Sequence, residues 1–384
     1  SLSSGMTNIT KDVLGLSIGI LSYGWMVQHL AIFTIEPTWF VYIITFVVID
    51  FQGYWSHRWN HHINVFWNRH IIHHSSEYFN LACALRQSIS SIFNLFTFLL
   101  LPAAILGIPH SLIAILSPVH LFAQFWYHTI YIGKMGYLEK IIVTPSHHRV
   151  HHAINPEYKD KNLSQIFIIW DKLFGTFQTE LPKVPPVYGI TRPAETWNPI
   201  KINYQHLILM IKDAWYTRNW FDKIRIWFMP TGWRPDDVID DYPVNTINNP
   251  YNFQRYDTDS SISLKMFMVT QIFFLGCFIF YLLSNLSDIS SPGIFLYGIF
   301  IGLSIYTLTD LMDHNASALL FETLKTILGL GILLSPRGWF NAKEFIPWIE
   351  TVIGIYFILV FSITAWLVYI HWKQDYRLKF SADH

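Results

Sequence analysis

Charged side chains are scarce in this chain and balanced in sign. They make up 14% of the 384 residues, whereas soluble domains carry about 25%. The 26 basic residues match the 26 acidic ones, so the chain lacks the positive field that attracts nucleic acid. Two cysteines are too few for a disulfide framework. These shortages exclude a nucleic-acid partner and a disulfide-rich scaffold.

Several cofactor and catalytic motifs are also missing. The chain contains no HExxH motif of a zinc hydrolase and no Gly-rich dinucleotide loop after a strand. It also has no HPGG stretch of a fused cytochrome b5 and no cysteine set for an iron–sulfur cluster. We therefore expect no electron-transfer module within the chain. Reducing equivalents must come from a separate protein or a small diffusible reductant.

Long apolar runs, in contrast, are abundant. Hydrophobic residues make up 52% of the chain, and aromatic residues 17%. Crossing a bilayer takes about 20 apolar residues. Eight segments approach that length, although Glu322 and Lys325 interrupt the seventh: Val13–Phe33, Trp39–Trp55, Ile92–Ile108, Ser111–Ile132, Met266–Leu283, Ile294–Leu308, Leu319–Leu334 and Val352–Trp372. We predict an all-α, polytopic helical membrane protein.

The apolar runs divide the chain into three parts. Residues 1–132 hold the N-terminal transmembrane helices, residues 133–263 form a polar cap, and residues 264–384 hold C-terminal hydrophobic helices. Two histidine clusters are separated by two predicted helices, so both lie on one face of the membrane. That face is rich in lysine and arginine, while the opposite connections "TIEP" and "GIPH" contain neither. The positive-inside rule then places the histidines on the cytoplasmic side.

Spacing within these clusters is regular. Ten of the 18 histidines fall within "HRWNHHINVFWNRHIIHH" and "HHRVHH". On a helix, residues three or four apart project from neighbouring positions, and two such imidazoles can chelate one ion. The three sets at this spacing are His57 and His61; His70, His73 and His74; and His148, His151 and His152. Eight imidazoles are enough for two metal ions.

Two other interpretations of the clusters compete with a catalytic site. A purely structural role would require both clusters to share spacing and membrane face by chance. A membrane metal transporter or storage protein would also bind metals, but transport predicts ionisable residues along a pore. The histidines instead gather at helix ends. Spacing alone therefore predicts metal binding, without deciding the metal.

Polar residues near the clusters are candidates to support the imidazoles, because a ligating histidine usually donates its second N–H to a carboxylate or carbonyl. Asp50 lies seven residues before His57, and Glu77 follows His74 by three. Asn80 and Asp171 are further candidates, with helix capping or loop hydrogen bonds as their alternative roles.

The pattern HxxxH, HxxHH, HxxHH resembles the fatty acid hydroxylase and sterol desaturase superfamily of membrane di-iron enzymes. Within it, longer stretches covering residues 50–235 are similar to the alkylglycerol monooxygenase family. These stretches are "HHSSEYFNLACALRQS", "QFWYHT", "TPSHHRVHH", "DKN", "IIWDKLFGTF" and "YGITRP".

The resemblance implies a set of nine metal ligands, which adds the histidine of "QFWYHT" to the three sets: His57, His61, His70, His73, His74, His128, His148, His151 and His152. His120 shares a helical face with His128, while His62 and His147 project away from their neighbours. Tyr158 matches a family tyrosine, and we assign it to the catalytic site with Glu77 and Asn80.

The resemblance further implies a monooxygenase that uses two iron ions and O2 to hydroxylate a membrane lipid, with zinc able to replace iron in purified protein. The expected target is the ether-bonded carbon of an alkylglycerol; the alternative is hydroxylation or desaturation of a fatty acyl, sterol or amino lipid. The electron donor is a tetrahydropterin or a cytochrome b5-type protein. His62 stands where that family has a glutamate, which puts pterin dependence in doubt.

Overall fold

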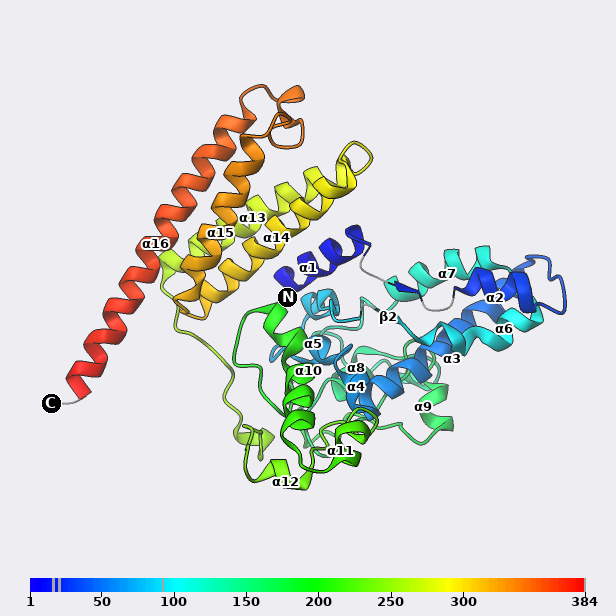
Figure 1. Ribbon diagram of the computed structural model, residues 1–384. Coiled ribbons are helices and arrows are strands. Elements are labelled where there is room, and N and C mark those ends of the chain that lie inside the picture. The colour runs from blue at the N-terminus through cyan, green and yellow to red at the C-terminus, as the bar shows by residue number, and fades with distance from the viewer. Residues whose placement is uncertain (16–17, 20–21, 92, 383–384) are drawn as a thin grey trace. The chain divides into compact units, whose positions relative to one another are not determined.

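The computed structural model describes residues 1–15, 18–19, 22–91 and 93–382 (Figure 1). Helices dominate these ranges. The strands found there are β1 (Ile18–Gly19) and β2 (Phe93–Asn94), which pair in parallel over two residues each. The predicted all-α class is confirmed.

The chain forms two compact units, and each is discontinuous in sequence. Unit 1 contains Ser17–Ala194 and Ile202–Arg255, and therefore all of the histidine clusters. Unit 2 contains Ser3–Leu16, Glu195–Lys201 and Tyr256–His384. The three-part division drawn from hydropathy remains a prediction.

Unit 2 is built mainly from apolar helices. Three helical stretches are long and apolar enough to cross a membrane: Ile262–Ser284, Ser291–Met312 and Ile349–His371. The Ser261 hydroxyl caps the first of these by accepting from the Leu264 N–H at 3.2 Å. The helices of this unit are α1 (Leu2–Val13), α13 (Ile262–Ser284), α14 (Ser291–Met312), α15 (Ser317–Leu333), η5 (Ala342–Glu344) and α16 (Ile349–Ala382).

Helix α15 packs closely against α16. A Cβ atom on Gly329 would lie 2.3 Å from Cζ of the Phe357 ring, so the missing side chain permits the approach. The two charges that interrupt this apolar run form a buried ion pair, with Lys325 Nζ 2.8 Å from Glu322 Oε2. Pairing reduces the cost of burying the two charges inside a helical bundle.

The apolar helices of unit 1 include one long helix and several short ones. Helix α3 (Trp39–His62) contains the predicted segment Trp39–Trp55 and continues through seven further residues that carry the first histidines. Around it lie α2 (Tyr23–Leu30), η2 (Phe96–Leu100), α6 (Leu101–Leu106) and α7 (His110–Phe122). Tyr23, Met26 and Ile49 share a buried apolar cluster with Ala103 and Ala104.

Three predicted spans of unit 1 are not single helices. The segment Ile92–Ile108 contains β2, η2 and α6. The segment Val13–Phe33 contains β1 and the eight-residue α2, and its residues 16–17 and 20–21 lie outside the described residues, as does residue 92 of Ile92–Ile108. The segment Ser111–Ile132 ends as a helix at Phe122. Pro118 has no N–H group, so α7 lacks one backbone donor at this position. Beyond the helix, the N–H groups of Gln124, Phe125 and His128 each donate to the carbonyl oxygen three residues earlier. His128 therefore lies beyond α7, although it falls within the helix predicted over Ser111–Ile132.

The remaining elements of unit 1 are short and connected by long loops. Those next to the first two histidine sets are α4 (Asn64–Trp67), α5 (Ile71–His74) and η1 (Leu81–Leu85). The later ones are η3 (Gly136–Lys140), α8 (Pro145–His151), α9 (Ile169–Leu173), α10 (Pro199–Tyr216), α11 (Trp220–Arg225), α12 (Asp236–Ile239) and η4 (Pro250–Asn252).

Candidate metal centre

Three short helical turns of unit 1 carry the histidine sets. His57 and His61 stand one turn apart at the end of α3, and α5 carries His73 and His74. Helix α8 begins with Pro145 after Thr144, an N-cap residue whose backbone N–H lies 3.4 Å from His147 Nδ1. His147 is thus occupied in capping the helix. His62 is exposed on the far side of α3.

The structure brings the nine predicted ligands together in two groups, and no predicted ligand lies outside them. Within each group, one nitrogen from every histidine lies within 4.8 Å of the others. Opposite nitrogens bound to one ion at about 2.0–2.1 Å would lie roughly 4 Å apart. The first group is His57, His61, His70, His74 and His151, and the second is His73, His128, His148 and His152.

Each of the two HxxHH sets contributes to both groups. On α5, His74 joins the first group and His73 the second; on α8, His151 joins the first and His152 the second. The His74 and His152 rings stack across the boundary with their centroids 4.3 Å apart. Neighbouring residues on a helix diverge by about 100°, so one turn can serve two adjacent ions. The two groups therefore form one centre.

Most of these imidazoles are oriented by hydrogen bonds at Nδ1. A histidine that donates its Nδ1–H to a carbonyl oxygen leaves Nε2 as the free ligand atom. The acceptors are Leu163 O for His57 (2.7 Å), Arg86 O for His73 (3.3 Å), Gln124 O for His128 (3.1 Å) and Lys161 O for His151 (3.0 Å). This assigns the Nδ1-protonated tautomer to these four rings.

Several inward nitrogens are buried without a hydrogen-bond partner. Nε2 of His61, His74 and His151 each lacks one, although buried polar atoms are nearly always satisfied. For His61 and His151, Nδ1 already has an acceptor, so Nε2 presents a lone pair. Clustered imidazole lone pairs in a buried site are the donor set that a transition-metal ion requires. The residues therefore fit a dimetal centre.

Burial also keeps these histidines neutral. It lowers the pKa of His128 to about 4, although hydrogen bonds to the backbone carbonyls of Phe125 and Gln124 act in the opposite direction. Burial, followed by repulsion from neighbouring imidazoles, lowers the pKa of His74, His148 and His152 well below the usual value. A metal binds the neutral form of imidazole, so the site is ready for a metal at neutral pH.

Asp160 is the carboxylate that reaches the first group. Its Oδ1 lies 3.2 Å from His61 Nδ1. Burial disfavours the charge of Asp160, yet the hydrogen bond with His61 lowers its pKa below the usual value. Both Asp160 and Asn162 have left-handed backbones, with φ of 57° and 53°, which aspartate and asparagine tolerate well. The "DKN" stretch therefore folds into a turn that directs a carboxylate to His61, a role that sequence reasoning missed.

Asp50 and Asp171, two carboxylates that the sequence did predict, bind groups next to the histidine groups and accept no hydrogen bond from the nine clustered histidines themselves. Asp171 accepts from the backbone N–H groups of Leu163 (2.7 Å) and Ser164 (2.9 Å), and so fixes the carbonyl that holds His57. Asp50 accepts from His120 Nε2 at 2.8 Å and from two backbone N–H groups of the same loop. His120 is thus bound to Asp50 and falls in neither histidine group.

The three residues assigned to catalysis have the following surroundings. The Asn80 side chain accepts from the Ala82 N–H and caps η1. The Tyr158 hydroxyl accepts from the Leu181 N–H at 2.8 Å and lies 2.7 Å from Val184 O. Glu77 is partly buried, and its Cγ would lie 3.5 Å from a Cβ on Gly189. Their catalytic role remains a prediction.

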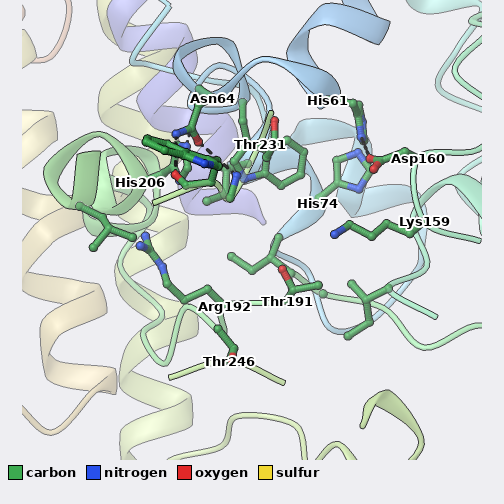
Figure 2. A pocket seen from close by; sticks show the side chains of 18 of the residues that line it. His61, Asn64, His74, Lys159, Asp160, Thr191, Arg192, His206, Thr231 and Thr246 are labelled. Atoms are coloured by element: carbon green, nitrogen blue, oxygen red, sulfur yellow. Dashed lines mark hydrogen bonds and ion pairs between the residues drawn. The ribbon is translucent and has the colours of Figure 1, made fainter. Parts of the chain in front are cut away.

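A cavity of about 310 Å³ opens beside the first group. Figure 2 shows His61, His74 and Asp160 toward one end, and Arg192 and His206 toward the other. Arg192 is half-buried and makes no ion pair within the described residues. The wall behind it contains a pair in which Arg234 donates to both carboxylate oxygens of Asp213, at 2.6 and 2.8 Å. The cavity therefore combines access to the centre with polar and cationic groups.

Two of these cavity residues bear on the sequence interpretation. His206 lies outside the three histidine sets that the sequence indicates. The structure places it in the cavity wall, with Nε2 2.9 Å from Asn64 O. Arg192 belongs to the "YGITRP" stretch, which was the available signal for it.

The fold and this centre define a class of membrane-associated, histidine-rich enzymes. The sequence model of the fatty acid hydroxylase family matches residues 42–176, a range that includes all nine clustered histidines. The chain is 34% identical over 363 residues to alkylglycerol monooxygenase of Homo sapiens, covering 93% of this chain and 79% of the relative. The chain therefore belongs to the fatty acid hydroxylase family and is an oxidoreductase of the monooxygenase type.

Other relatives are consistent with this assignment. The chain is 34% identical to the alkylglycerol monooxygenase of Xenopus tropicalis, over 86% of this chain and 73% of the relative. It is 28% identical to the ornithine lipid hydroxylase OlsE of Rhizobium tropici, over 40% of this chain and 47% of the relative. No solved structure matches the chain. Lipid hydroxylation is the activity that these relatives support.

Proposed function

We propose that the chain is a di-iron lipid monooxygenase whose nine clustered histidines hold both metals on the cytoplasmic side of the membrane. The observation that carries this proposal is the pair of histidine groups, with buried Nε2 atoms that lack partners. When bound, two iron ions would supply the O2 activation needed to oxidise an unactivated C–H bond. Zinc offers no such redox chemistry, although it could occupy the same donors.

The chain's own groups hold, orient and shield the centre. The carbonyl oxygens of Leu163, Arg86 and Lys161 accept from ligand histidines and fix their rings. Asp160 accepts from His61 and makes that imidazole a stronger donor to a metal. Phe79 stacks on Tyr188, with ring centroids 5.0 Å apart, and covers His128 and His152. This aromatic cover limits the access of water to the second group.

We propose an alkylglycerol as the lipid, hydroxylated at its ether-bonded carbon. The relatives named for that activity support this choice, as does the cavity beside His61 and His74, whose wall includes polar groups. The C–H bond becomes C–OH, and the second oxygen atom of O2 leaves as water. Two electrons and two protons come from an external tetrahydropterin or cytochrome b5-type donor. The hemiacetal then breaks down to an aldehyde and glycerol.

The proposed substrate suggests roles for residues of the cavity wall and for the three residues assigned to catalysis. The glycerol end of the lipid would lie in the cavity, where Thr191, Arg192 and Thr246 offer hydrogen-bonding groups. Glu77, Asn80 and Tyr158 stay assigned to the catalytic site. Asn80 and Tyr158 act through the backbone segments that they hold, namely residues 80–82 and 181–184. Glu77 lies next to Gly189, which lines the cavity.

The test uses full-length protein in lipid nanodiscs, loaded with iron and supplied with a tetrahydropterin or a reduced cytochrome b5. Alkylglycerol should be converted to aldehyde with matching O2 uptake, and His151→Ala should lose at least about 100-fold of this activity. His29→Ala, an exposed residue of α2, is the matched control. Conversion of ornithine lipid but not of alkylglycerol would show that the substrate is an amino lipid. Metal flux into proteoliposomes without O2 uptake would overturn the enzyme.

A further inference from the structure

Helix α10 has apolar side chains on two opposite faces. Its inner face is buried: His206 and Met210 line the cavity beside the centre. Its outer face carries Ile208, Ile211 and Trp215, which are 48%, 51% and 80% exposed. These three residues are spaced by three and four positions, so they form one continuous stripe along the helix.

Further exposed apolar side chains follow on α11 and in the turn after it. Trp220, Phe221, Ile224 and Phe228 are between 65% and 78% exposed. We call the complete set the aromatic face; it consists of Ile208, Ile211, Trp215, Trp220, Phe221, Ile224 and Phe228. Soluble proteins rarely leave so many large apolar side chains together in water. The aromatic face therefore requires a partner that covers it.

The exposed charges on α10, α11 and their connecting turns share one sign. Between residues 202 and 229, both acidic side chains are buried and paired, Asp213 with Arg234 and Asp222 with Arg225. The exposed or half-exposed charges in this stretch are all cations: Lys212, Arg218, Lys223 and Arg225. The exposed acidic residues nearby lie on α12, where Asp237 accepts hydrogen bonds from the Thr217 hydroxyl and the Arg218 N–H. The surface thus combines apolar rings with cations, a composition that complements lipid chains and phosphate head groups.

Two of the cations lie against the rings. Lys223 Nζ is 5.6 Å from the Trp220 ring centroid, and the Arg225 guanidinium carbon is 5.4 Å from that of Phe221. Long basic side chains at a bilayer surface cover apolar area with their stems and keep their charge near the head groups. Tryptophan also prefers this boundary, because its ring is apolar and its N–H is polar.

We propose that the aromatic face lies in the head-group region of a lipid bilayer and anchors α10 and α11 there as an interfacial element. The same chain provides its own attachment to a bilayer, because α13, α14 and part of α16 have the length and hydropathy of membrane spans. Interfacial helices insert their apolar side by about 5–10 Å. The exposed rings and the cations beside them, carried by the same two helices, are the composition that this contact requires.

The inner face of the same helix lines the cavity next to His74. With the bilayer on its outer side, α10 would place the cavity within reach of a lipid that leaves the membrane. This consequence rests on the proposed function, whereas the bilayer contact does not. The contact is therefore testable without measuring turnover.

The experiment places an environment-sensitive fluorophore on single cysteines of the full chain in nanodiscs. Cys277→Ser removes the exposed native thiol, while Cys83 is buried. Trp220→Cys and Phe228→Cys report on the aromatic face, and Lys183→Cys, an exposed loop residue of unit 1, is the matched control. Nitroxide groups are placed on the lipid either near the head group or at the chain end.

We expect blue-shifted emission at positions 220 and 228, with stronger quenching by the shallow nitroxide than by the deep one, and neither effect at position 183. Water-like emission at both positions would overturn the proposal. So would blue-shifted emission that no lipid nitroxide quenches, because that result identifies a protein partner on the aromatic face. Metal content equal to that of the unmodified chain would show that each labelled variant is folded.

Discussion

His120 and Asp50, 70 positions apart in sequence, are joined by a 2.8 Å hydrogen bond between Nε2 and Oδ1 inside unit 1. The same carboxylate accepts from the N–H groups of Ile166 and Phe167 and from the Trp170 indole. This arrangement separates His120 from the nine clustered histidines. It links α7 to the loop that carries the Leu163 carbonyl oxygen.

His120→Ala should therefore keep the full metal content and lose stability. Removing the ring leaves Asp50 with one donor fewer and a void, a cost of about 1–3 kcal/mol. Metal analysis and thermal unfolding in detergent measure the two effects. His128→Ala, which removes a member of the second group, should lose metal instead. Equal metal loss in both variants would contradict the distinction.

Asp160→Ala should reduce metal affinity or activity by about 10–100-fold, because it removes the acceptor that orients His61. Asp160→Asn retains a side-chain oxygen and should recover part of this loss. Titration of the metal-free protein with Fe²⁺ gives the affinities directly. An unchanged affinity in the alanine variant would show that the His61 ring is oriented without Asp160.

The acid stability of the protein should depend on His206. Burial lowers its pKa to about 4 from the usual 6.5, so between these values the unfolded chain binds a proton that the folded chain does not. The stability contributed by the neutral ring is present above pH 6.5 and lost as the pH falls toward 4. His206→Gln should make this acid limb shallower by up to about 1.4 kcal/mol per pH unit. Denaturant unfolding at a series of pH values measures the slope, and identical slopes would refute the prediction.

Gly329→Ala should destabilise unit 2 by about 1–3 kcal/mol, since the new methyl group would overlap the buried Phe357 ring. Gly331→Ala is the matched control, because a Cβ there would meet no atom within 4 Å. Alanine favours a helix over glycine by up to about 1 kcal/mol, so the control should be neutral or stabilised. Thermal unfolding in detergent compares the two variants. Equal effects in the two variants would show that α15 and α16 can move apart at Gly329 without a loss of stability.

Much of the candidate site could be predicted from the sequence because its signal is local. Histidines at helical spacing are recognisable wherever a helix forms, and the predicted ligands all fall within the two groups. The apolar runs of α13, α14 and α16 could also be predicted from the sequence, since each run is continuous. Where apolar segments were broken by turns, as after Phe122, hydropathy averaged over the break and predicted helices that were too long.

The sequence by itself determined which side chains are able to bind metal and which segments avoid water, because both depend on residue type and on a period of three to four residues. Only the tertiary structure decided which histidines are able to share an ion, since His73 and His74 are neighbours in sequence but belong to different groups. It also decided what orients them: His57 meets the Leu163 carbonyl oxygen across 106 positions, and His61 meets Asp160 across 99. Such partners are fixed by packing between distant segments. A backbone carbonyl acceptor cannot be predicted from residue type, because every residue has one.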